Sequence, residues 1–254
     1  MFHTFLLTLL SAFAASTPTD APPPPPPFAV VELFTSQGCH SCPPADAVLS
    51  DLMNEYAERK TPVYALSFHV DYWNYLGWRD PFSDAQFSQR QRDYARRLNS
   101  RVYTPQMIVN GQTEFVGSRR REATQHLSDA LAARPDRMVR ATATRDGDRV
   151  SVDFSTDATR GTVHVALVER GIETAVGRGE NRNRTLRHDN VVRAFASVAA
   201  PGSGDGSVVL EVPKSSKYPV NHARTEVIVY VQDAHLGPVR AATRAAYRDE
   251  NTEF

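Results

Sequence analysis

Cysteine is scarce in this chain, which contains only Cys39 and Cys42 among its 254 residues. Two cysteines cannot build the network of several disulfides that stabilises many small secreted folds. They also leave a tetrahedral metal ion short of ligands, even if His40 joins them. A disulfide that closes a loop of about four residues stabilises a fold by only about 2 kcal/mol. The pair therefore favours redox chemistry over a structural staple or a metal site.

An excess of charge of either sign is also lacking, because 29 Lys and Arg residues balance 29 Asp and Glu residues. This balance argues against nucleic-acid binding. Tracts rich in methionine or histidine are absent as well, which argues against a protein dedicated to copper traffic. The length and composition are those of a soluble globular protein with one large domain or two ordinary ones.

The apolar run near the start of the chain, residues 2–15, is shorter than the roughly 20 residues that a membrane-spanning helix needs. It contains Ala12-Phe13-Ala14, a small-residue cleavage pattern, so residues 1–15 are predicted to be a secretory signal peptide. No Lys or Arg precedes the run, which keeps an uncleaved anchor as the alternative. No cysteine directly follows it, which excludes a lipid-modified cysteine there. We expect an exported protein, periplasmic or secreted, with no stable membrane span after signal cleavage.

Residues 16–27 are predicted to be a proline-rich linker. The prolines at positions 22–27 must be extended, and in polyproline II geometry they span roughly 19 Å. Such a segment is a stiff tether or, alternatively, a ligand for a proline-reading domain. It cannot contribute to a core, so the folded part is expected to begin near Phe28.

The two cysteines lie between a predicted strand and a predicted helix. Residues 30–34 are mostly apolar with β-branched members, and residues 35–38 have the composition of a turn. Beyond Pro44, apolar residues recur at helical spacing: Ala45, Val48, Leu49, Leu52 and Tyr56. The helix is therefore predicted to begin near Cys42, where its dipole favours the thiolate form of an exposed cysteine. A protonated His40 would favour the thiolate further.

The elements that follow give the order β-α-β-α-β-β-α. Residues 63–70 are predicted to form a strand parallel to the first, and residues 83–98 a helix with Ser83 as its N-cap. Asn110-Gly111 between two apolar runs predicts a hairpin with a type I′ turn. Residues 121–133 complete this part as a helix.

The segment between the second strand and the second helix is rich in aromatic residues, namely Tyr72, Trp73, Tyr75, Trp78 and Phe82. Two interpretations stay open at this point. The rings pack onto the surface of the domain, or they form a substrate-binding wall beside the cysteines.

Residues 34–39, 69–73 and 104–106, together with this order of elements, resemble the thioredoxin-like superfamily. More closely, the chain resembles an uncharacterised family of exported bacterial thioredoxin-like proteins. The resemblance implies a thioredoxin-like domain over residues 28–134, with Cys39 as the nucleophile and Cys42 as the resolving cysteine. It also implies that Pro105 is the cis-proline of the fold. Pro105 would lie against the disulfide, and Thr104, Trp73 and Tyr72 are the candidate substrate-binding residues.

One departure from the thioredoxin pattern concerns proton transfer. Thioredoxins bury a carboxylate below the disulfide, and Leu33 occupies the nearest matching position here. Glu32 is one residue away and would face the other side of the sheet. Asp71 and His69, at the end of the second strand, are further candidates for a proton relay.

From about residue 138 the sequence changes to short alternating runs, which lie at residues 139–144, 150–154, 163–168, 191–198, 208–212 and 227–231. Clusters of turn residues separate them, so residues 137–247 are predicted to form an antiparallel β-sandwich. The junction between the two domains is expected at Arg134-Pro135-Asp136.

A basic segment lies inside this second part and contains Arg178, Arg182, Arg184, Arg187 and His188. A solvated hairpin explains it best, and a grip for an acidic partner is the alternative.

The sequence thus predicts an exported thiol–disulfide oxidoreductase that uses Cys39 and Cys42, assisted by Pro105 and His40, with no cofactor or metal besides its own disulfide. Its partners would be a protein or small molecule that carries a thiol or disulfide, and a reductase or oxidase that recycles the cysteines. Two alternatives remain: a copper-binding protein that holds Cu(I) through both cysteines, and a non-catalytic binding module.

Overall fold

The computed structural model describes residues 25–202, 204–215 and 217–249. The predicted signal peptide and most of the predicted linker lie outside these residues. Within them, no helix combines the length and the apolar character that crossing a membrane requires.

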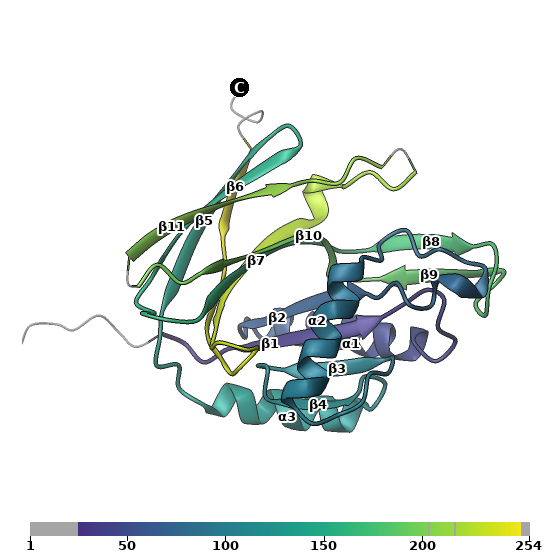
Figure 1. Ribbon diagram of the computed structural model, residues 1–254, viewed down its shortest axis with the longest axis horizontal. Coiled ribbons are helices and arrows are strands. Elements are labelled where there is room, and N and C mark those ends of the chain that lie inside the picture. The colour runs from purple at the N-terminus through teal and green to yellow at the C-terminus, as the bar shows by residue number, and fades with distance from the viewer. Residues whose placement is uncertain (1–24, 203, 216, 250–254) are drawn as a thin grey trace, which may run out of the picture.

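The first part of the chain contributes four strands and three helices (Figure 1). Strand β1 (Ala29–Thr35) pairs in parallel with β2 (Val63–His69) and antiparallel with β3 (Gln106–Val109), which pairs antiparallel with β4 (Thr113–Val116). The helices are α1 (Pro43–Glu58), α2 (Ala85–Arg97) and α3 (Arg120–Ala132). The predicted start of α1 near Cys42 and the predicted hairpin are confirmed.

Two local features of this part follow directly from residue chemistry. Asn110 and Gly111 both have positive φ angles, 46° and 66°, as a type I′ turn requires. The predicted N-cap of α2 is wrong by one residue, because Asp84, and not Ser83, accepts the hydrogen bond from the backbone N–H of Gln86 at 2.8 Å. The Ser83 hydroxyl instead donates to the carbonyl of Asp80 at 2.8 Å.

The second part of the chain is almost entirely β-structure. Its strands are β5 (Val139–Asp146), β6 (Arg149–Thr156), β7 (Thr162–Glu169), β8 (Ile172–Val176), β9 (Arg184–His188), β10 (Val191–Ala199), β11 (Gly204–Glu211), β12 (Thr225–Gln232), β13 (Val239–Arg244) and β14 (Ala246–Asp249). Short 3-10 helices occupy Asn74–Leu76 and His222–Arg224.

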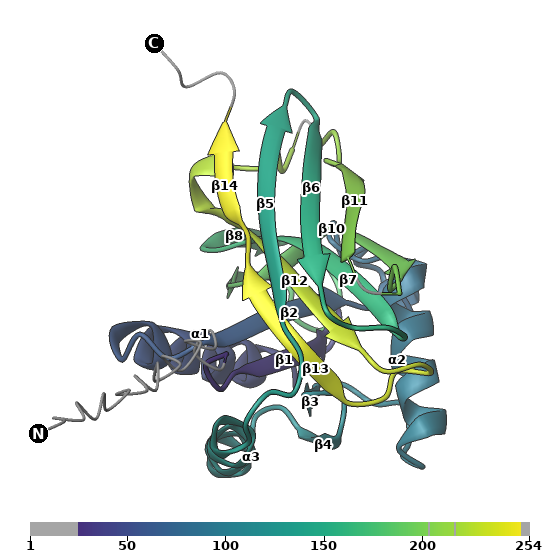
Figure 2. The ribbon, with the colours of Figure 1, turned by 90° about the vertical axis from the view of Figure 1, so that its left-hand side faces the viewer.

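The strands after residue 137 were expected to form a sandwich of their own, but the main sheet runs across the predicted boundary. Its eight strands have the order β13-β12-β7-β10-β2-β1-β3-β4, and a separate four-stranded sheet has the order β11-β6-β5-β14 (Figure 2). The join lies at β2, where the backbone N–H of Ser67 donates to the carbonyl of Asn190 at 2.7 Å and the Ser67 hydroxyl donates to that of Asp189 at 2.9 Å. Without this contact, β2 would present an unpaired edge.

The large sheet is covered on both faces, as the alternation of side chains along β7 demonstrates. Val165 and Leu167 belong to the apolar core shared with the four-stranded sheet, whereas Ala166 and Val168 belong to the core under α2. Farther along the sheet, α1 and α3 cover Val31 of β1 on the face opposite to α2. Each strand therefore alternates between two cores.

A buried charged group ties α2 to both parts of the sheet. The guanidinium of Arg90 on α2 contacts Glu32 of β1 through two hydrogen bonds of 2.6 and 2.9 Å. Its Nη2 also donates to the Tyr230 hydroxyl at 3.0 Å and to Gln232 at 3.1 Å, both on β12. Burial opposes the charge, but Glu32 outweighs burial and raises the pKa of Arg90 above its ordinary value. The group stays charged because its partners surround it.

Replacing Glu32 by Gln should therefore leave Arg90 without its buried counter-charge and lower the free energy of unfolding by roughly 3–5 kcal/mol. Urea denaturation followed by circular dichroism measures this change. Glu211→Gln is the matched control, since Glu211 pairs with Arg149 at a site where both side chains are 67% exposed. It should cost less than about 1 kcal/mol. Equal losses in the two variants would contradict the role given to Arg90.

Candidate functional site

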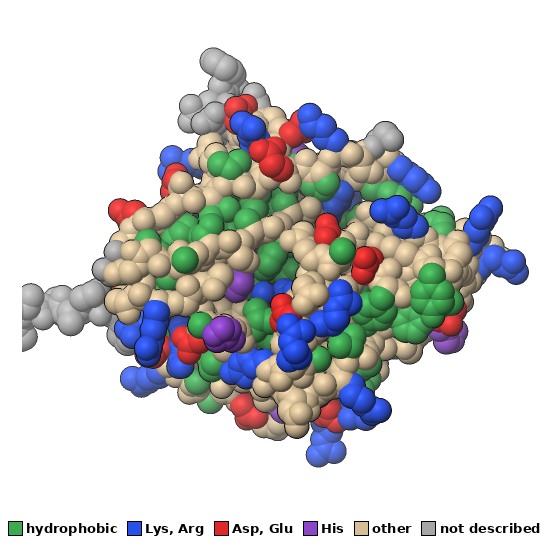
Figure 3. All heavy atoms as spheres, viewed as in Figure 1, with side chains coloured by type: hydrophobic (Ala, Val, Ile, Leu, Met, Phe, Trp, Pro, Cys, Tyr) green, Lys and Arg blue, Asp and Glu red, His purple; other side chains and the backbone are tan. Residues whose placement is uncertain are grey.

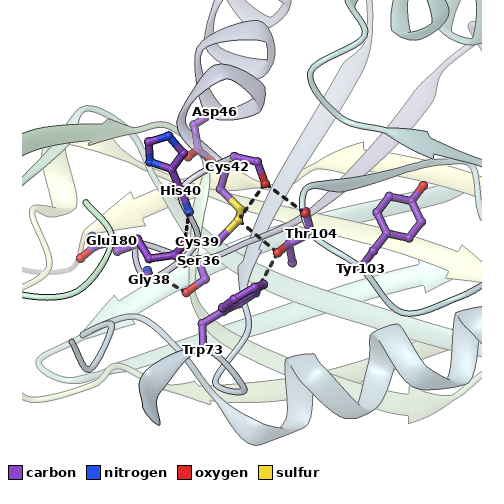
Figure 4. The surroundings of a disulfide bond; sticks show 12 residues. Ser36, Gly38, Cys39, His40, Cys42, Asp46, Trp73, Tyr103, Thr104 and Glu180 are labelled. Atoms are coloured by element: carbon purple, nitrogen blue, oxygen red, sulfur yellow. Dashed lines mark hydrogen bonds between the residues drawn. A yellow bond between two sulfur atoms is a disulfide. The ribbon is translucent and has the colours of Figure 1, made fainter. Parts of the chain in front are cut away.

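The two cysteines form a disulfide at the point where the chain leaves β1 and enters α1 (Figure 4). Their Cα atoms lie 5.5 Å apart. Cys42 is the N-cap residue of α1, and its carbonyl accepts hydrogen bonds from the backbone N–H groups of Ala45 and Asp46. The prolines after it occupy the first helical positions, where no intrahelical partner for an N–H is needed. The helix N-terminus is therefore directed at the disulfide, as predicted.

Both cysteines of the disulfide are buried, which corrects the expectation that one of them is exposed. Cys39 is 1% exposed and Cys42 is not exposed at all, whereas the two residues between them, His40 and Ser41, are exposed. The Thr104 hydroxyl donates to the Cys39 sulfur at 3.2 Å, and the Trp73 indole N–H donates to the same hydroxyl at 2.8 Å. Trp73 and Thr104 thus lie over Cys39 (Figure 4).

Other predicted binding residues take positions near this cover. The Thr104–Pro105 peptide bond is cis, as predicted, and Pro105 is buried. The ring of Tyr72 lies 6.1 Å from that of Trp73, and its hydroxyl donates to Gln91 on α2 at 3.0 Å. Burial raises the pKa of Tyr72 to about 12. Tyr72 therefore stays neutral and supports Trp73 from the side of α2.

The aromatic segment contributes to the site in part. The Trp78 indole N–H donates to Gln37 at 3.0 Å, two residues before Cys39. Tyr75 is 78% exposed, and Phe82 is buried against Tyr218. Trp73 and Trp78 therefore lie beside the cysteine turn, Phe82 packs against the second part of the chain, and Tyr75 faces solvent.

The three predicted relay residues have different partners. Glu32 is bound to Arg90, and the carboxylate of Asp71 accepts a hydrogen bond from Ser88 on α2 at 2.5 Å. His69 lies 2.7 Å from the carboxylate of Asp80, a residue that the sequence did not single out. Asp80 also accepts a hydrogen bond from the backbone N–H of Gln37 at 2.8 Å.

The Asp80 carboxylate is held in its ionised form. Burial would raise its pKa, but the contact with His69 and the backbone donors at Gln37 and Phe82 outweigh burial and hold the pKa of Asp80 below its ordinary value. The turn that precedes Cys39 is therefore anchored to a buried negative charge.

A hairpin from the second part of the chain reaches the disulfide, which the sequence did not predict. It consists of β8 and β9, and its loop carries Glu180 and Asn181. The Asn181 side chain is buried and donates to the carbonyls of Gln37 and Cys39, both at 2.9 Å. The carboxylate of Glu180 accepts a hydrogen bond from the backbone N–H of His40 at 2.9 Å. These contacts hold the turn between the cysteines from the side opposite to Thr104.

The basic segment is indeed a hairpin, but its members divide into two sets. The exposed set consists of Arg178, Arg182, Arg184 and Arg187. Figure 3 shows basic side chains at the end of the molecule where this hairpin lies, next to a hydrophobic patch. The second set is His188 alone, which is buried. It is 1% exposed, and its Nδ1 atom lies 3.5 Å from the carboxylate of Asp46 on α1. Strand alternation separates it from its neighbour Arg187.

The acidic side chains around His188 favour the charged form of its imidazole. Burial opposes the charged form, but Asp46 above all, followed by Asp80 and Asp189, outweighs burial and raises the pKa of His188 above its ordinary value. The ring of His69 also packs against it, with the centroids 4.8 Å apart. Over the residues that the structure describes, no group of three or more His, Cys, Asp and Glu side chains is arranged to hold a metal ion.

Comparison with known proteins gives the family of the chain. Residues 30–232 match the family described as protein of unknown function (DUF1223), and the chain belongs to this family. The crystal structure of a protein from Agrobacterium tumefaciens is similar, with 30% identity and a TM-score of 0.62 over 86% of this chain and 93% of that one. HBP35 of Porphyromonas gingivalis shares 14% identity and a TM-score of 0.59 over 90% of this chain and 79% of that one, a likeness of fold alone. No curated protein matches the chain.

The raised pKa of His188 predicts a pH-dependent contribution to stability. A group whose pKa is raised on folding stabilises the fold fully below its unfolded pKa of about 6.5, and this contribution is lost as the pH rises through the folded value. The free energy of unfolding should therefore differ more between the wild type and His188→Gln at pH 5.5 than at pH 9, as measured by urea denaturation. Asp46, His69, Asp80 and Asp189 are the titratable groups that face the ring.

A matched control for this experiment is Val176→Ala in the same hairpin, since Val176 is 2% exposed and does not titrate. Its loss of stability should be the same at both pH values. A difference for His188→Gln that does not vary with pH would show that the pKa of His188 is the same in the folded and the unfolded chain, which would contradict the prediction.

Proposed function

We propose that this chain is a thiol–disulfide oxidoreductase whose reacting group is the Cys39–Cys42 disulfide on a thioredoxin-like unit. The observation that carries the proposal is a disulfide between two cysteines separated by two residues, at the N-terminus of a helix. The Thr104 hydroxyl donates a hydrogen bond to the Cys39 sulfur. The strand order β2-β1-β3-β4, with β1 and β2 parallel and β3 antiparallel, supports the thioredoxin-like assignment. These are the parts that thiol–disulfide exchange requires.

The proposed reaction exchanges one S–S bond for another. In the reduced protein, the Cys39 thiolate attacks one sulfur of a substrate disulfide, and the other substrate sulfur leaves as a thiolate. Cys42 then attacks the Cys39 sulfur of this mixed disulfide, which forms the intramolecular disulfide and releases the second substrate sulfur. The substrate gains two electrons and the protein loses two. The reverse sequence oxidises a dithiol substrate.

The groups around Cys39 support its role as the attacking sulfur. The Thr104 hydroxyl is positioned to donate to a thiolate, and the N-terminal end of α1 favours negative charge at this place. Cys42 is fully buried, which suits a resolving cysteine because its reaction partner is the Cys39 sulfur and not the substrate. A substrate sulfur can reach Cys39 only if the cover formed by Trp73 or by the β8–β9 loop moves aside.

The site of action that we propose is an oxidising compartment outside the cytoplasm. The predicted signal peptide supports export, and a dithiol pair in such a compartment can rest as a disulfide. A separate reductase or oxidase would return the cysteines to their starting state after each exchange.

A redox titration tests the proposed function directly. The wild-type protein is equilibrated in glutathione buffers of graded potential, and its free thiols are trapped and counted by mass spectrometry. We expect one reversible two-electron transition between about −300 and about −100 mV. Cys39→Ser should show no such transition. A disulfide that stays fully oxidised across this range in the wild type would contradict a role in exchange.

The two cysteines should also behave unequally towards substrate. Cys42→Ser retains the attacking sulfur but cannot resolve the mixed disulfide, so it should accumulate mixed disulfides with a disulfide-bonded test peptide. Cys39→Ser should accumulate few, because the Thr104 hydroxyl that would stabilise an attacking thiolate is placed at the Cys39 sulfur. Non-reducing gel electrophoresis and mass spectrometry quantify the adducts. Equal trapping by the two variants would refute the assigned division of roles.

A further inference from the structure

Four buried titratable side chains from four different segments form a connected group next to Cys42. Asp46 comes from α1, His188 from β9, His69 from β2 and Asp80 from the segment between β2 and α2. None of them is more than 4% exposed. They link in the order Asp46–His188–His69–Asp80, through separations of 3.5 Å, 4.8 Å between ring centroids, and 2.7 Å.

Asp46 is the member nearest to the resolving cysteine along the helix. It follows Cys42 by four residues, and residues four apart lie one above the other on the same face of a helix. Figure 4 shows Asp46 on α1 next to Cys42. Neither carboxylate oxygen of Asp46 has a hydrogen-bond partner among the described residues.

The imidazole nitrogens show the same lack of partners. Within the described chain, the Nε2 atoms of His188 and His69 have no hydrogen-bond partner, and the Nδ1 atom of His188 has only the Asp46 carboxylate, at 3.5 Å. Buried polar atoms without partners are costly, and proteins keep few of them. A group that serves only to hold the fold together would be expected to have its hydrogen bonds satisfied, as Glu32 and Arg90 do.

The proposed exchange reaction creates a need for a proton acceptor at this place. Cys42 must lose its thiol proton before it can attack the mixed disulfide, and its sulfur is enclosed away from solvent. Burial disfavours the thiolate, so water cannot readily remove the proton. The proton acceptor must therefore lie inside the protein.

We propose that Asp46, together with His188, accepts the proton of the Cys42 thiol during resolution, an inference that rests on the proposed function. The S–H bond of Cys42 breaks, and its proton passes to the Asp46 carboxylate, which His188 holds in place from 3.5 Å. The Cys42 sulfur then bonds to the Cys39 sulfur, and the substrate sulfur leaves with the electron pair of the broken bond. In the reverse direction the same pair returns the proton to Cys42.

The other two members of the group position the acceptor. Asp80 fixes the His69 ring through Nδ1, and the His69 ring packs edge-on against that of His188. Asp189, beside His188 in sequence, accepts a hydrogen bond from the backbone N–H of Gly171 at 2.7 Å. Asp46 and His188 are therefore the pair that can exchange a proton with the sulfur, and His69 and Asp80 are positioning residues.

Single-turnover kinetics test this assignment. Reduced protein is mixed with a disulfide-bonded peptide, and acid quenching followed by mass spectrometry measures mixed-disulfide formation and its resolution separately between pH 5 and pH 9. In Asp46→Asn, formation should stay within about twofold of the wild-type rate. Resolution should slow at least tenfold at pH 6, and its pH profile should move to higher pH. His188→Gln should show a smaller shift in the same direction, and Asp46→Glu should restore part of the rate.

The matched control is Asp51→Asn on the same helix, whose carboxylate is 66% exposed and pairs with Arg120 on the surface. It should leave both steps and both pH profiles unchanged. A merely structural role for Asp46 would slow both steps together without moving the pH profile of resolution, and this result would overturn the inference. Should Asp46→Asn fail to fold, the pH profile of His188→Gln decides in its place.

The experiment also separates the inference from the function on which it rests. If the wild type forms no mixed disulfide with the peptide, the proposed function itself fails. If the wild type cycles and both variants resolve at its rate with its pH profile, only the assignment of Asp46 and His188 is wrong.

Discussion

The buried guanidinium of Arg90 requires hydrogen-bond partners from several distant segments of the chain. A charge enclosed in a protein is tolerated only when several partners compensate it at once. Here the carboxylate comes from Glu32 on β1 and further oxygens come from Tyr230 and Gln232 on β12, which lie 140 or more residues from Arg90 in sequence. β12 therefore cannot separate from the first part of the chain without depriving the buried Arg90 guanidinium of two hydrogen-bond partners.

This condition explains why the site is assembled from both parts of the chain. The strand β10 is fixed beside β2 by the same sheet, and the β8–β9 hairpin precedes β10 directly. The hairpin is thereby carried to the end of β2, where Asn181 binds the Cys39 carbonyl and His188 reaches Asp46 on α1. The residues that contact the cysteine turn and the start of α1 therefore come from a hairpin that is far from the cysteine motif in sequence.

The sequence predicted the features that depend on local chemistry. The strand, turn and helix around Cys39 follow from apolar spacing and from glycine and proline, and the hairpin follows from Asn110-Gly111. The pairing of β10 with β2 could not be predicted, because an alternating strand fits equally well into its own sandwich or onto the edge of another sheet. Two site residues did leave a signal. Asp46 is in phase with the buried Leu49 and Met53 on α1, and His188 is in phase with the buried Leu186 on β9.

Because Cys39 is buried, a reaction partner can reach its sulfur only if one of the groups that cover it moves. The contacts that hold these groups differ in number on the two sides of Cys39. The loop of the β8–β9 hairpin is tied to the cysteine turn by three hydrogen bonds, two from Asn181 and one to Glu180. Trp73 is tied to this place by one side-chain hydrogen bond, to Thr104, and by packing against Gly38, Tyr72 and the core under α2. Displacing Trp73 breaks one side-chain hydrogen bond and displacing the loop breaks three, each worth about 0.5–1.5 kcal/mol. In the proposed exchange, the side of Trp73 is therefore the easier path for a substrate sulfur, and the hairpin can keep its contacts with the cysteine turn.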